Sequence, residues 1–463
     1  MNLEQIKNIY FVGIGGIGMS ALARYFKSLG KNVAGYDKTE TALTKELVKE
    51  GMQIHYNDCV MDIPEEYRNK NNTLIINTPA VPKDHQEFTY FRENGFGIKK
   101  RAEVLGIISN SKDVLAIAGT HGKTTTSTMV SHLLKNSDVD CSAFLGGISL
   151  NFHTNLLLSK ESNYVVVEAD EFDRSFLHLH PKAAIVTSMD ADHLDIYGNY
   201  EEYKKAFHEF IGQIKEDGFL VVKKGLDIGT PSPNLKVFTY SLNEKADFCA
   251  SNIRVIDGWY HFDIETPVGS MRDMKLSFPG LLNVENAIAA STMSILLGMK
   301  QTDIRKALET FKGVKRRFEY HIKTDNLVMI DDYGHHPEEL RYTIESVKAL
   351  YKGKRITGIF QPHLFSRTND LMDEFASSLS LLDELILLDI YPAREKPIPG
   401  VTSEKLLSKV TIANKHCCHK GDLVNFLKAQ PMPEVLIMMG AGDIENSLAP
   451  VKKMLEERQK EKA

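Results

Sequence analysis

The stretch Val114-Leu-Ala-Ile-Ala-Gly-Thr-His-Gly-Lys-Thr-Thr-Thr126 decides the fold of this chain. It begins with a run of apolar or small residues and continues with two glycines, a lysine and three threonines. A short apolar run of this kind is typical of a buried strand, and threonines after a glycine loop favour the start of a helix. The stretch therefore predicts a strand, a tight phosphate-binding loop and a helix.

The side chains of this loop match the chemistry of a nucleoside triphosphate. Gly119 and Gly122 let the backbone turn so that several N–H groups converge on an anion. Lys123 supplies a positive charge for the outer phosphates, and the Thr124 hydroxyl can coordinate the accompanying magnesium. The helix that starts near Thr125 turns its positive end toward the same anion. The predicted ATP-binding residues of the loop are Gly119, Thr120, His121, Gly122, Lys123, Thr124 and Thr125.

The loop departs from the usual Gly-x-x-x-x-Gly-Lys-Ser/Thr spacing, because Ile117 occupies the position of the first glycine. An ordinary strand-to-helix turn with a capping threonine is therefore an alternative. The order Gly-x-x-Gly-Lys-Thr directly after an apolar run favours the phosphate loop.

Composition excludes several classes of partner. The chain has 463 residues, enough for two to four domains, and a net charge of -5. This charge gives no steering field for nucleic acid, so no nucleic-acid partner is expected. No apolar stretch is long enough to cross a bilayer, which predicts a cytoplasmic protein without membrane insertion. The 5 cysteines include no Cys-x-x-Cys pair, and His416-Cys-Cys-His419 lacks the spacing of a zinc site.

The N-terminal region carries a second glycine-rich loop. An apolar strand, residues 8–12, runs into Gly13-Ile-Gly15-Gly16-Ile-Gly18 and a helix-favouring segment. A further short strand ends at Asp37, about where an acidic residue meets a ribose in a dinucleotide fold. Taken alone, this pattern suggests NAD, but the same geometry holds any nucleotide diphosphate.

The middle region supplies two more strand ends with reactive side chains. Tyr164-Val-Val-Val-Glu168 is a continuous apolar run that ends in a carboxylate, and the strand at 183–187 is followed by His193. Ligands collect at the carboxyl ends of parallel strands, so Thr124, Glu168 and His193 are predicted to converge. Oxygen ligands with one imidazole suit magnesium, with manganese as the alternative. Singly, Glu168 could form a strand-end salt bridge and His193 could be a capping or core histidine.

Later segments offer contacts for a base and for phosphate. Residues 237–278 alternate in the manner of a small antiparallel sheet. Asn283 and Asn286 then share one face of a predicted helix and can hydrogen-bond a base edge, although Asn283 could instead cap that helix. The basic pair that ends at Arg317 is available for phosphate contact.

From about residue 325 the chain again alternates between strand and helix. Each predicted strand ends in polar residues, and the carboxyl ends of such strands define one crevice. This crevice is the predicted site of a second substrate. The strand ends include Asp332 with His335, then Arg367, and then Tyr391 with Arg394.

Taken in order, these motifs resemble those of the Mur ligases over nearly the whole chain. The residues that carry the resemblance are Gly119-Thr-His-Gly-Lys-Thr-Thr-Thr126, Glu168-Ala-Asp-Glu171, Asp190-Ala-Asp-His193-Leu-Asp195, Asn283 with Asn286, Arg316-Arg317-Phe318, Asp332-Tyr-Gly-His-His-Pro337 and Tyr391-Pro-Ala-Arg-Glu395. One position departs from the family pattern: Leu282 stands where the family usually has histidine.

The resemblance implies an α/β protein of three domains. A Rossmann-like N-terminal domain, 1–108, would hold a UDP-sugar. A central P-loop ATPase domain, 109–320, would have a mostly parallel sheet plus the small antiparallel sheet. A Rossmann-like C-terminal domain, 321–463, would bring in the amino acid. In that light the N-terminal glycines bind UDP and not NAD.

The resemblance also implies an activity and a set of roles. It is nearest to the branch of the family that joins L-alanine to UDP-N-acetylmuramate with ATP in peptidoglycan synthesis, as a monomer or weak homodimer. Thr124, Glu168 and His193 would hold the metal, and Lys123, Glu168 and His193 would be catalytic. The remaining implied contacts are Asn283, Asn286, Arg317 and Asp332 for the nucleotide, Gly13, Gly15, Gly16, Gly18 and Asp37 for the UDP-sugar, and His335, Arg367, Tyr391 and Arg394 for alanine.

Three alternatives remain open at this point. The related ligase that attaches a recovered tripeptide to the same sugar tends to carry a longer insert after Glu171, which this chain lacks. An NAD-dependent dehydrogenase would explain the N-terminal glycines and leave Lys123, Glu168 and His193 without a role. A nucleotide-binding regulator without enzymatic activity is the third.

Overall fold

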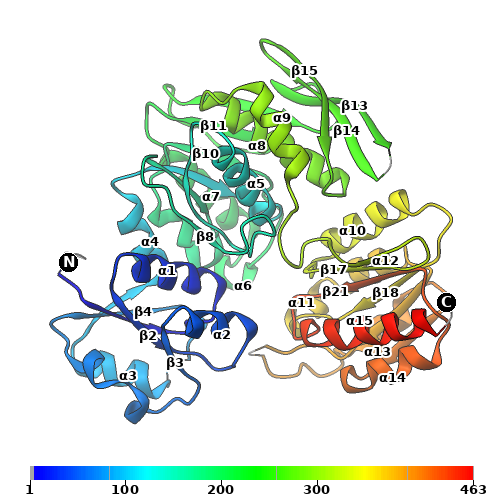
Figure 1. The fold of residues 1–463 in the computed structure, drawn as a ribbon, viewed down its shortest axis with the longest axis horizontal. Helices are drawn as coiled ribbons and strands as arrows, with labels where there is room; N and C mark the ends of the chain where they lie inside the picture. The colour runs from blue at the N-terminus through cyan, green and yellow to red at the C-terminus, as the bar shows by residue number, and fades with distance from the viewer. Residues whose placement is uncertain (1–4, 83, 257, 394, 462–463) are drawn as a thin grey trace. The chain divides into compact units, whose positions relative to one another are not determined.

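The protein is described by a computed structural model over residues 5–82, 84–256, 258–393 and 395–461 (Figure 1). The chain forms two compact units. The first comprises Met1–Asn252, Phe262–Lys275 and Glu285–Phe311, and the second comprises Ile253–His261, Leu276–Val284 and Lys312–Ala463. Three β-sheets with covering helices make up these units, as expected for an α/β protein.

The N-terminal sheet has five strands in the order β3-β2-β1-β4-β5, and all its pairings are parallel. β1 is buried along its whole length, which explains its unbroken apolar sequence. Thr41 caps α2 with a reciprocal capping box to Thr44. The elements are β1 Asn8–Val12, α1 Ile17–Ser28, β2 Asn32–Tyr36, α2 Ala42–Lys49, β3 Gln53–His55, β4 Thr73–Asn77, α3 Gln86–Glu93, β5 Gly97–Lys100 and α4 Arg101–Ser109.

The central sheet has ten strands in the order β15-β14-β13-β12-β11-β10-β6-β9-β7-β8. β6, the strand predicted before the phosphate loop, lies between β10 and β9 and pairs parallel with both. The strands are β6 Asp113–Ala118, β7 Ser142–Phe144, β8 Leu156–Leu157, β9 Tyr164–Glu168, β10 Ala183–Val186, β11 Phe219–Lys223, β12 Lys236–Ser241, β13 Phe248–Ile256, β14 Trp259–Thr266 and β15 Gly269–Leu276. The helices are α5 Lys123–Lys135, α6 Leu194–Tyr197, α7 Tyr200–Gly212, α8 Leu281–Leu296 and α9 Gln301–Thr310.

The prediction of a small antiparallel sheet was wrong for β12. This strand pairs parallel with β11 and with β13, and β13 to β15 extend the central sheet. Residues 224–235 supply a connection long enough to return the chain to the same end of the sheet, which a parallel neighbour requires. Sequence alternation reports one exposed face and does not report strand direction.

One hydrophobic cluster runs through both the N-terminal and the central sheet layers. It contains Leu22 and Phe26 of α1, Val104 of α4, and Phe144 and Phe176 of the central region. The rings of Tyr25 and Phe144 are 5.5 Å apart, and a Cβ at Gly106 would lie 2.6 Å from the carbonyl oxygen of His178. These two layers therefore share a single core.

The C-terminal sheet has six strands in the order β16-β17-β21-β18-β19-β20. Only the β16–β17 pairing is antiparallel. In Figure 1, α10 and α12 lie on one side of this sheet and α14 and α15 on the other. The elements are β16 Glu319–Lys323, β17 Val328–Asp332, α10 Pro337–Leu350, β18 Ile356–Phe360, α11 Phe365–Asp370, α12 Met372–Leu379, β19 Glu384–Leu388, α13 Ser403–Lys409, β20 Lys415–Cys418, α14 Leu423–Ala429, β21 Val435–Met439 and α15 Glu445–Lys460.

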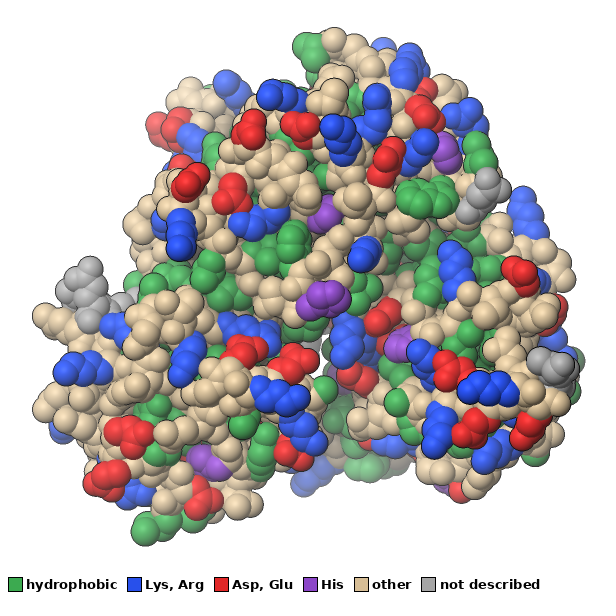
Figure 2. All heavy atoms as spheres, in the orientation of Figure 1, with side chains coloured by type: hydrophobic (Ala, Val, Ile, Leu, Met, Phe, Trp, Pro, Cys, Tyr) green, Lys and Arg blue, Asp and Glu red, His purple; other side chains and the backbone are tan. Residues whose placement is uncertain are grey.

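Two further observations concern the charged surface and the length of the helices. Acidic and basic side chains are interspersed over the face drawn in Figure 2, in keeping with the small net charge of -5. Within the part of the chain that the structure describes, none of the helices has the length and apolar character needed to cross a membrane.

The buried residue Leu436 tests how strongly the C-terminal core holds its sheet. It is 0% exposed at the centre of β21, among the apolar residues of α14 and α15. Leu436→Ala should lower the free energy of unfolding by about 2 to 5 kcal/mol, because the cavity adds to the lost burial. Val268→Ala, at a position 86% exposed, should change it by less than about 0.5 kcal/mol. Urea unfolding measures both, and equal effects would contradict the core assignment.

Candidate active site

The phosphate loop is held in shape by residues that follow β10. The Thr187 hydroxyl donates to the carbonyl oxygens of Ala118, at 3.2 Å, and of His121, at 2.5 Å. The N–H of His121 donates to the Ser188 hydroxyl at 2.8 Å. Gly119 has φ +135°, and a Cβ there would overlap the Thr187 hydroxyl, so only glycine fits. The loop is thus braced by its neighbouring strand.

The remaining loop residues surround the start of α5. The Thr120 hydroxyl donates to the carbonyl oxygen of Asp190 and lies 2.8 Å from the Tyr203 hydroxyl. Gly122, with φ +81°, forms the N-cap of α5. Thr124 and Thr125 are buried in the first turn of that helix. The N-terminus of α5 therefore opens onto the loop, as an anion site requires.

Lys123 is turned into the loop and toward one carboxylate. Its Nζ donates to the carbonyl oxygen of Gly119 at 2.6 Å and to Glu171 at 2.9 Å. The Glu171 side chain is only 2% exposed, and that of Lys123 is 14% exposed. The two form a buried ion pair beside the phosphate loop.

Burial and charge act in opposite directions on this pair. Burial alone would lower the pKa of Lys123, but the charges of Glu171, Asp170 and Glu168 outweigh it and raise the pKa. Burial raises the pKa of Glu171 to about 7, although Lys123 opposes the shift. Lys123 therefore stays charged at neutral pH, while Glu171 can take up a proton when the lysine moves away.

Glu168 lies beside the threonine of the loop. Its Oε1 accepts a hydrogen bond from the Thr124 hydroxyl at 3.1 Å, and its Oε2 accepts one from Ser127 at 3.5 Å. A Cβ at Gly146 would overlap the Glu168 carboxylate, so the backbone approaches it closely. Hydroxyl and carboxylate oxygens are the donors that magnesium prefers, and this arrangement fits such an ion.

His193 lies at the Glu171 side of the same cluster. Its Nε2 is 3.9 Å from Glu171 Oε1 and 3.7 Å from Asp192 Oδ2. Its ring contacts Phe172 edge-on, with the centroids 5.2 Å apart. The structure thus places Thr124 beside Glu168. It places both Lys123 and His193 beside Glu171.

The two asparagines have different environments. Asn286 Oδ1 accepts a hydrogen bond from the Thr126 hydroxyl at 3.1 Å, and a Cβ at Gly122 would lie 2.9 Å from it. Asn286 therefore packs against the phosphate loop. In the second unit, Asn283 Nδ2 donates to the carbonyl oxygen of Pro279 at 2.5 Å. Because α8 begins at Leu281, Asn283 lies inside the helix and is not its N-cap.

In the N-terminal glycine loop, Asp37 contacts the loop itself. Its Oδ2 accepts a hydrogen bond from the N–H of Gly15 at 2.7 Å. Gly13 has φ +93°, and Gly16 is the N-cap of α1. A Cβ at Gly15 would lie 2.7 Å from the Thr44 methyl group, so this glycine allows close packing. Asp37 therefore shapes the turn that precedes α1.

A cavity of about 70 Å³ is lined both by the end of this loop and by the acidic residues that follow the apolar part of β9. Gly18 and Ile17 of α1 line one part of it, and Glu168 and Asp170 line another. Arg101, also in the lining, donates to Asp170 at 2.9 Å. Both the cavity and its lining belong to the first compact unit.

In the second unit, Arg317 contacts an aromatic ring and Asp332 accepts two backbone hydrogen bonds. The Arg317 guanidinium is 5.1 Å from the centroid of the Tyr333 ring. Asp332 accepts hydrogen bonds from the N–H groups of Phe318, at 2.9 Å, and Gly334, at 2.8 Å. Burial raises the pKa of Asp332, with the Arg317 charge opposing the shift.

The strand ends of the C-terminal sheet gather a row of rings. His335 and His363 have their centroids 6.1 Å apart, and His363 stacks on Tyr391 at 5.7 Å. Burial lowers the pKa of His335 to about 4, so its ring is neutral at physiological pH. Arg367 lies in α11, and its charge adds to that shift. Arg394 lies outside the described residues.

Sequence reasoning missed three residues that complete these clusters. Glu171 pairs with Lys123, Thr187 braces the phosphate loop, and His363 links His335 to Tyr391. Glu171 and His363 follow predicted strands and Thr187 is the last residue of one, so a place at a strand end was the available signal. The partner that each one contacts depends on the fold and was not visible in the sequence.

Comparison with known families finds three matching models in sequence order. Residues 8–113 match the Mur ligase family, catalytic domain; residues 117–294 match the Mur ligase middle domain; and residues 316–442 match the Mur ligase, glutamate ligase domain. The UDP-N-acetylmuramate--L-alanine ligase of Parabacteroides distasonis is 53% identical over 98% of this chain and 98% of its own length. That of Flavobacterium psychrophilum is 51% identical over 99% and 100%.

Solved structures agree with these matches. The UDP-N-acetylmuramate-alanine ligase of Thermotoga maritima superposes with a TM-score of 0.82 and 29% identity, covering 98% of this chain and 100% of its own. A murein peptide ligase of Psychrobacter arcticus, at 21% identity, has the same fold with a TM-score of 0.72, covering 97% and 98%. The sequence and the architecture together show that this chain belongs to the Mur ligase family.

Proposed function

We propose that the protein joins L-alanine to the lactyl carboxylate of UDP-N-acetylmuramate, with ATP as the energy source, in peptidoglycan synthesis. The observation that carries this proposal is the cavity that Gly18 and Glu168 both line. Its lining places the end of the glycine loop next to Glu168, so a UDP-sugar bound at that loop would face the phosphate loop and Lys123. The names of the relatives at 53% and 51% identity support the same reaction.

Each end of the reaction has residues to support it. Gly13, Gly15, Gly16 and Gly18 would bind the UDP-sugar, with Asp37 holding the turn. Gly119 to Thr125 would bind the phosphates, and Asn283, Asn286, Arg317 and Asp332 would contact the rest of the nucleotide. Thr124, Glu168 and His193 would hold magnesium, or manganese in its place. The bound ion would neutralise charge on the phosphates.

The chemistry proceeds in two balanced steps. The lactyl carboxylate attacks the γ-phosphorus, and the bond from this phosphorus to the β-γ bridging oxygen breaks. ADP departs, and an acyl phosphate is formed. The neutral amine of alanine then attacks the acyl carbon, phosphate leaves, and the amine loses a proton. Two anions approach each other in the first step, so the positive charge of Lys123 stabilises the transition state.

The amino acid would enter at the C-terminal sheet. His335, Arg367, Tyr391 and Arg394 are the proposed contacts, and His363 joins them because it stacks between two of these residues. We assign the UDP-sugar to residues 1–108, the ATP chemistry to 109–320 and the amino acid to 321–463. ATP and a nucleotide sugar as substrates place the reaction in the cytoplasm.

An acceptor series tests the proposed reaction. Phosphate release is measured with UDP-N-acetylmuramate and ATP while L-alanine, glycine, L-serine and the tripeptide are offered in turn. L-Alanine should give the highest kcat/KM, and release should stop when either the sugar or the acceptor is omitted. The tripeptide as the only good acceptor would establish the recycling reaction instead. Release that continues without the sugar would contradict both.

Lys123→Ala tests the separation of the nucleotide and sugar sites. Loss of the charge should lower kcat by about 100-fold or more, because no other group replaces it at the transition state. Binding of UDP-N-acetylmuramate, measured by calorimetry, should stay within about twofold of the unchanged protein, since the glycine loop lies on another sheet. Lys182→Ala, which removes a lysine paired with Asp217, is the matched control and should leave both quantities unchanged. Loss of sugar binding in folded Lys123→Ala would contradict the site assignment.

His335 should make the protein less stable as the pH falls. Its pKa is about 4 in the folded protein against an ordinary 6.5, so the unfolded chain binds more protons between these values. The stability it contributes is present above pH 6.5 and is lost as the pH falls toward about 4. Urea unfolding across this range should show a smaller loss for His335→Asn than for the unchanged protein. Equal losses would show that His335 titrates normally.

A further inference from the structure

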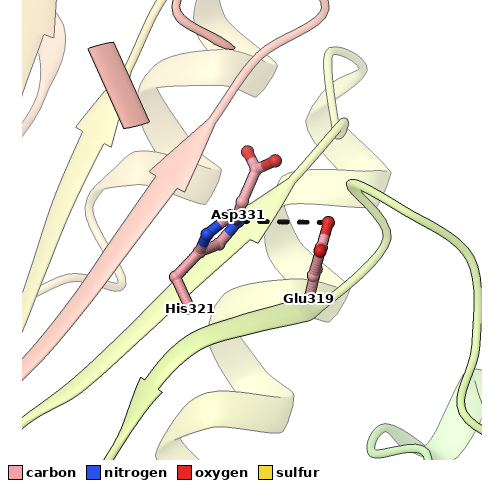
Figure 3. Close-up of side chains that lie close together, drawn as sticks. All are labelled: Glu319, His321 and Asp331. Carbon is pink, nitrogen blue, oxygen red and sulfur yellow. Dashed lines mark ion pairs between the residues drawn. The ribbon is translucent and has the colours of Figure 1, made fainter. Parts of the chain in front are cut away.

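Three side chains outside the proposed active site lie close together on β16 and β17 of the C-terminal sheet (Figure 3). Glu319 and His321 belong to β16, and Asp331 belongs to β17. Glu319 is paired with Asp331 across the antiparallel ladder, and the register of this ladder shifts between Tyr320 and Ile322, at His321. One ligand atom from each residue lies within 4.8 Å of the others. This spacing is within the reach of one metal ion.

The cluster contains a buried carboxylate oxygen that lacks a hydrogen bond. Asp331 is 0% exposed, and among the described residues its Oδ1 finds no hydrogen-bond partner. His321 Nε2 is in the same position, buried and without such a partner in the described part of the chain. His321 Nε2 lies 3.9 Å from Glu319 Oε2, the ion pair drawn in Figure 3. Buried polar atoms are normally satisfied, so an oxygen and a ring nitrogen without hydrogen bonds in one cluster indicate a missing ligand.

The charges around the cluster leave room for a dication. Arg316 Nε donates to Asp331 Oδ2 at 3.1 Å, and the Arg316 N–H donates to Glu319 Oε2 at 2.8 Å. This arginine neutralises one of the two carboxylates and leaves Asp331 Oδ1 available.

We propose that Glu319, His321 and Asp331 bind one transition-metal dication, for which Zn²⁺ is the best match. One imidazole nitrogen and two carboxylate oxygens suit zinc, which accepts mixed nitrogen and oxygen ligands and takes water as a fourth. Magnesium and calcium prefer oxygen ligands alone. The side chains of His321 and Glu319 are 21% and 17% exposed, which gives the ion a route in.

The location suggests what the ion would do. Asp331 directly precedes Asp332 in the sequence, and Arg316, which contacts Asp331, directly precedes Arg317. The cluster and the proposed nucleotide contacts therefore come from the same two segments. An ion shared by β16 and β17 would fasten this hairpin at the end that carries Arg317 and Asp332. It would act as a structural tie, separate from the magnesium proposed at Glu168.

Zinc stoichiometry tests the proposal. The full-length protein is dialysed against Zn²⁺ in the presence of excess Mg²⁺, which competes for the phosphate-loop site, and bound zinc is measured by mass spectrometry. The unchanged protein should hold about one equivalent more than His321→Ala. Zinc should also raise the melting temperature of the unchanged protein and leave that of His321→Ala where it is. Equal zinc content in the two proteins would overturn the proposal.

A matched control tests a different candidate zinc site in this unit, a segment of histidines and cysteines. His419→Ala disrupts the His416-Cys-Cys-His419 segment at β20 and should retain the equivalent that His321→Ala loses. If His419→Ala loses it instead, the zinc lies at β20 and the proposal is wrong. Glu319→Gln is the second variant and should also lose the equivalent, so the test stands even if His321→Ala fails to fold. Melting in the presence of a chelator verifies folding of each variant.

Discussion

The buried ion pair of Lys123 and Glu171 is the interaction on which the proposed active site depends. Burying two charges is costly, and removing one partner of such a pair commonly costs about 3 to 5 kcal/mol. Here the pKa of Glu171 is already about 7, so this carboxyl can be protonated when the lysine turns toward a phosphate. His193, 3.9 Å away, offers a second partner at that moment. The lysine can therefore be held in place before the nucleotide arrives and released at moderate cost.

Much of this arrangement could be predicted from the sequence. The apolar runs before Gly13 and Gly119 identified β1 and β6, and the polar residues after each later run identified strand ends. Thr124 and Glu168 were expected to lie together, and the Thr124 hydroxyl donates to Glu168 Oε1 at 3.1 Å. These successes share one physical basis, because parallel strands bring the ends of distant segments to a single edge.

The features that could not be predicted depend on contacts between segments. The hydrogen bond that Asp37 accepts from the Gly15 N–H was not expected from the sequence. The parallel direction of β12 was also missed, since alternation describes faces and not direction. Glu171 was quoted in a motif without a role, because nothing local distinguishes a carboxylate that will be buried beside a lysine from one that faces water.

The hydrophobic cluster that runs from α1 and α4 into the central sheet has a consequence for how this chain can be divided. Three family models match in sequence order, yet the first two regions share one core. A fragment that ended at the boundary near residue 108 would expose Leu22 and Phe26, which pack within that core. The N-terminal layer is therefore not an independent folding unit. Exchange of this layer between relatives would have to carry the central layer with it.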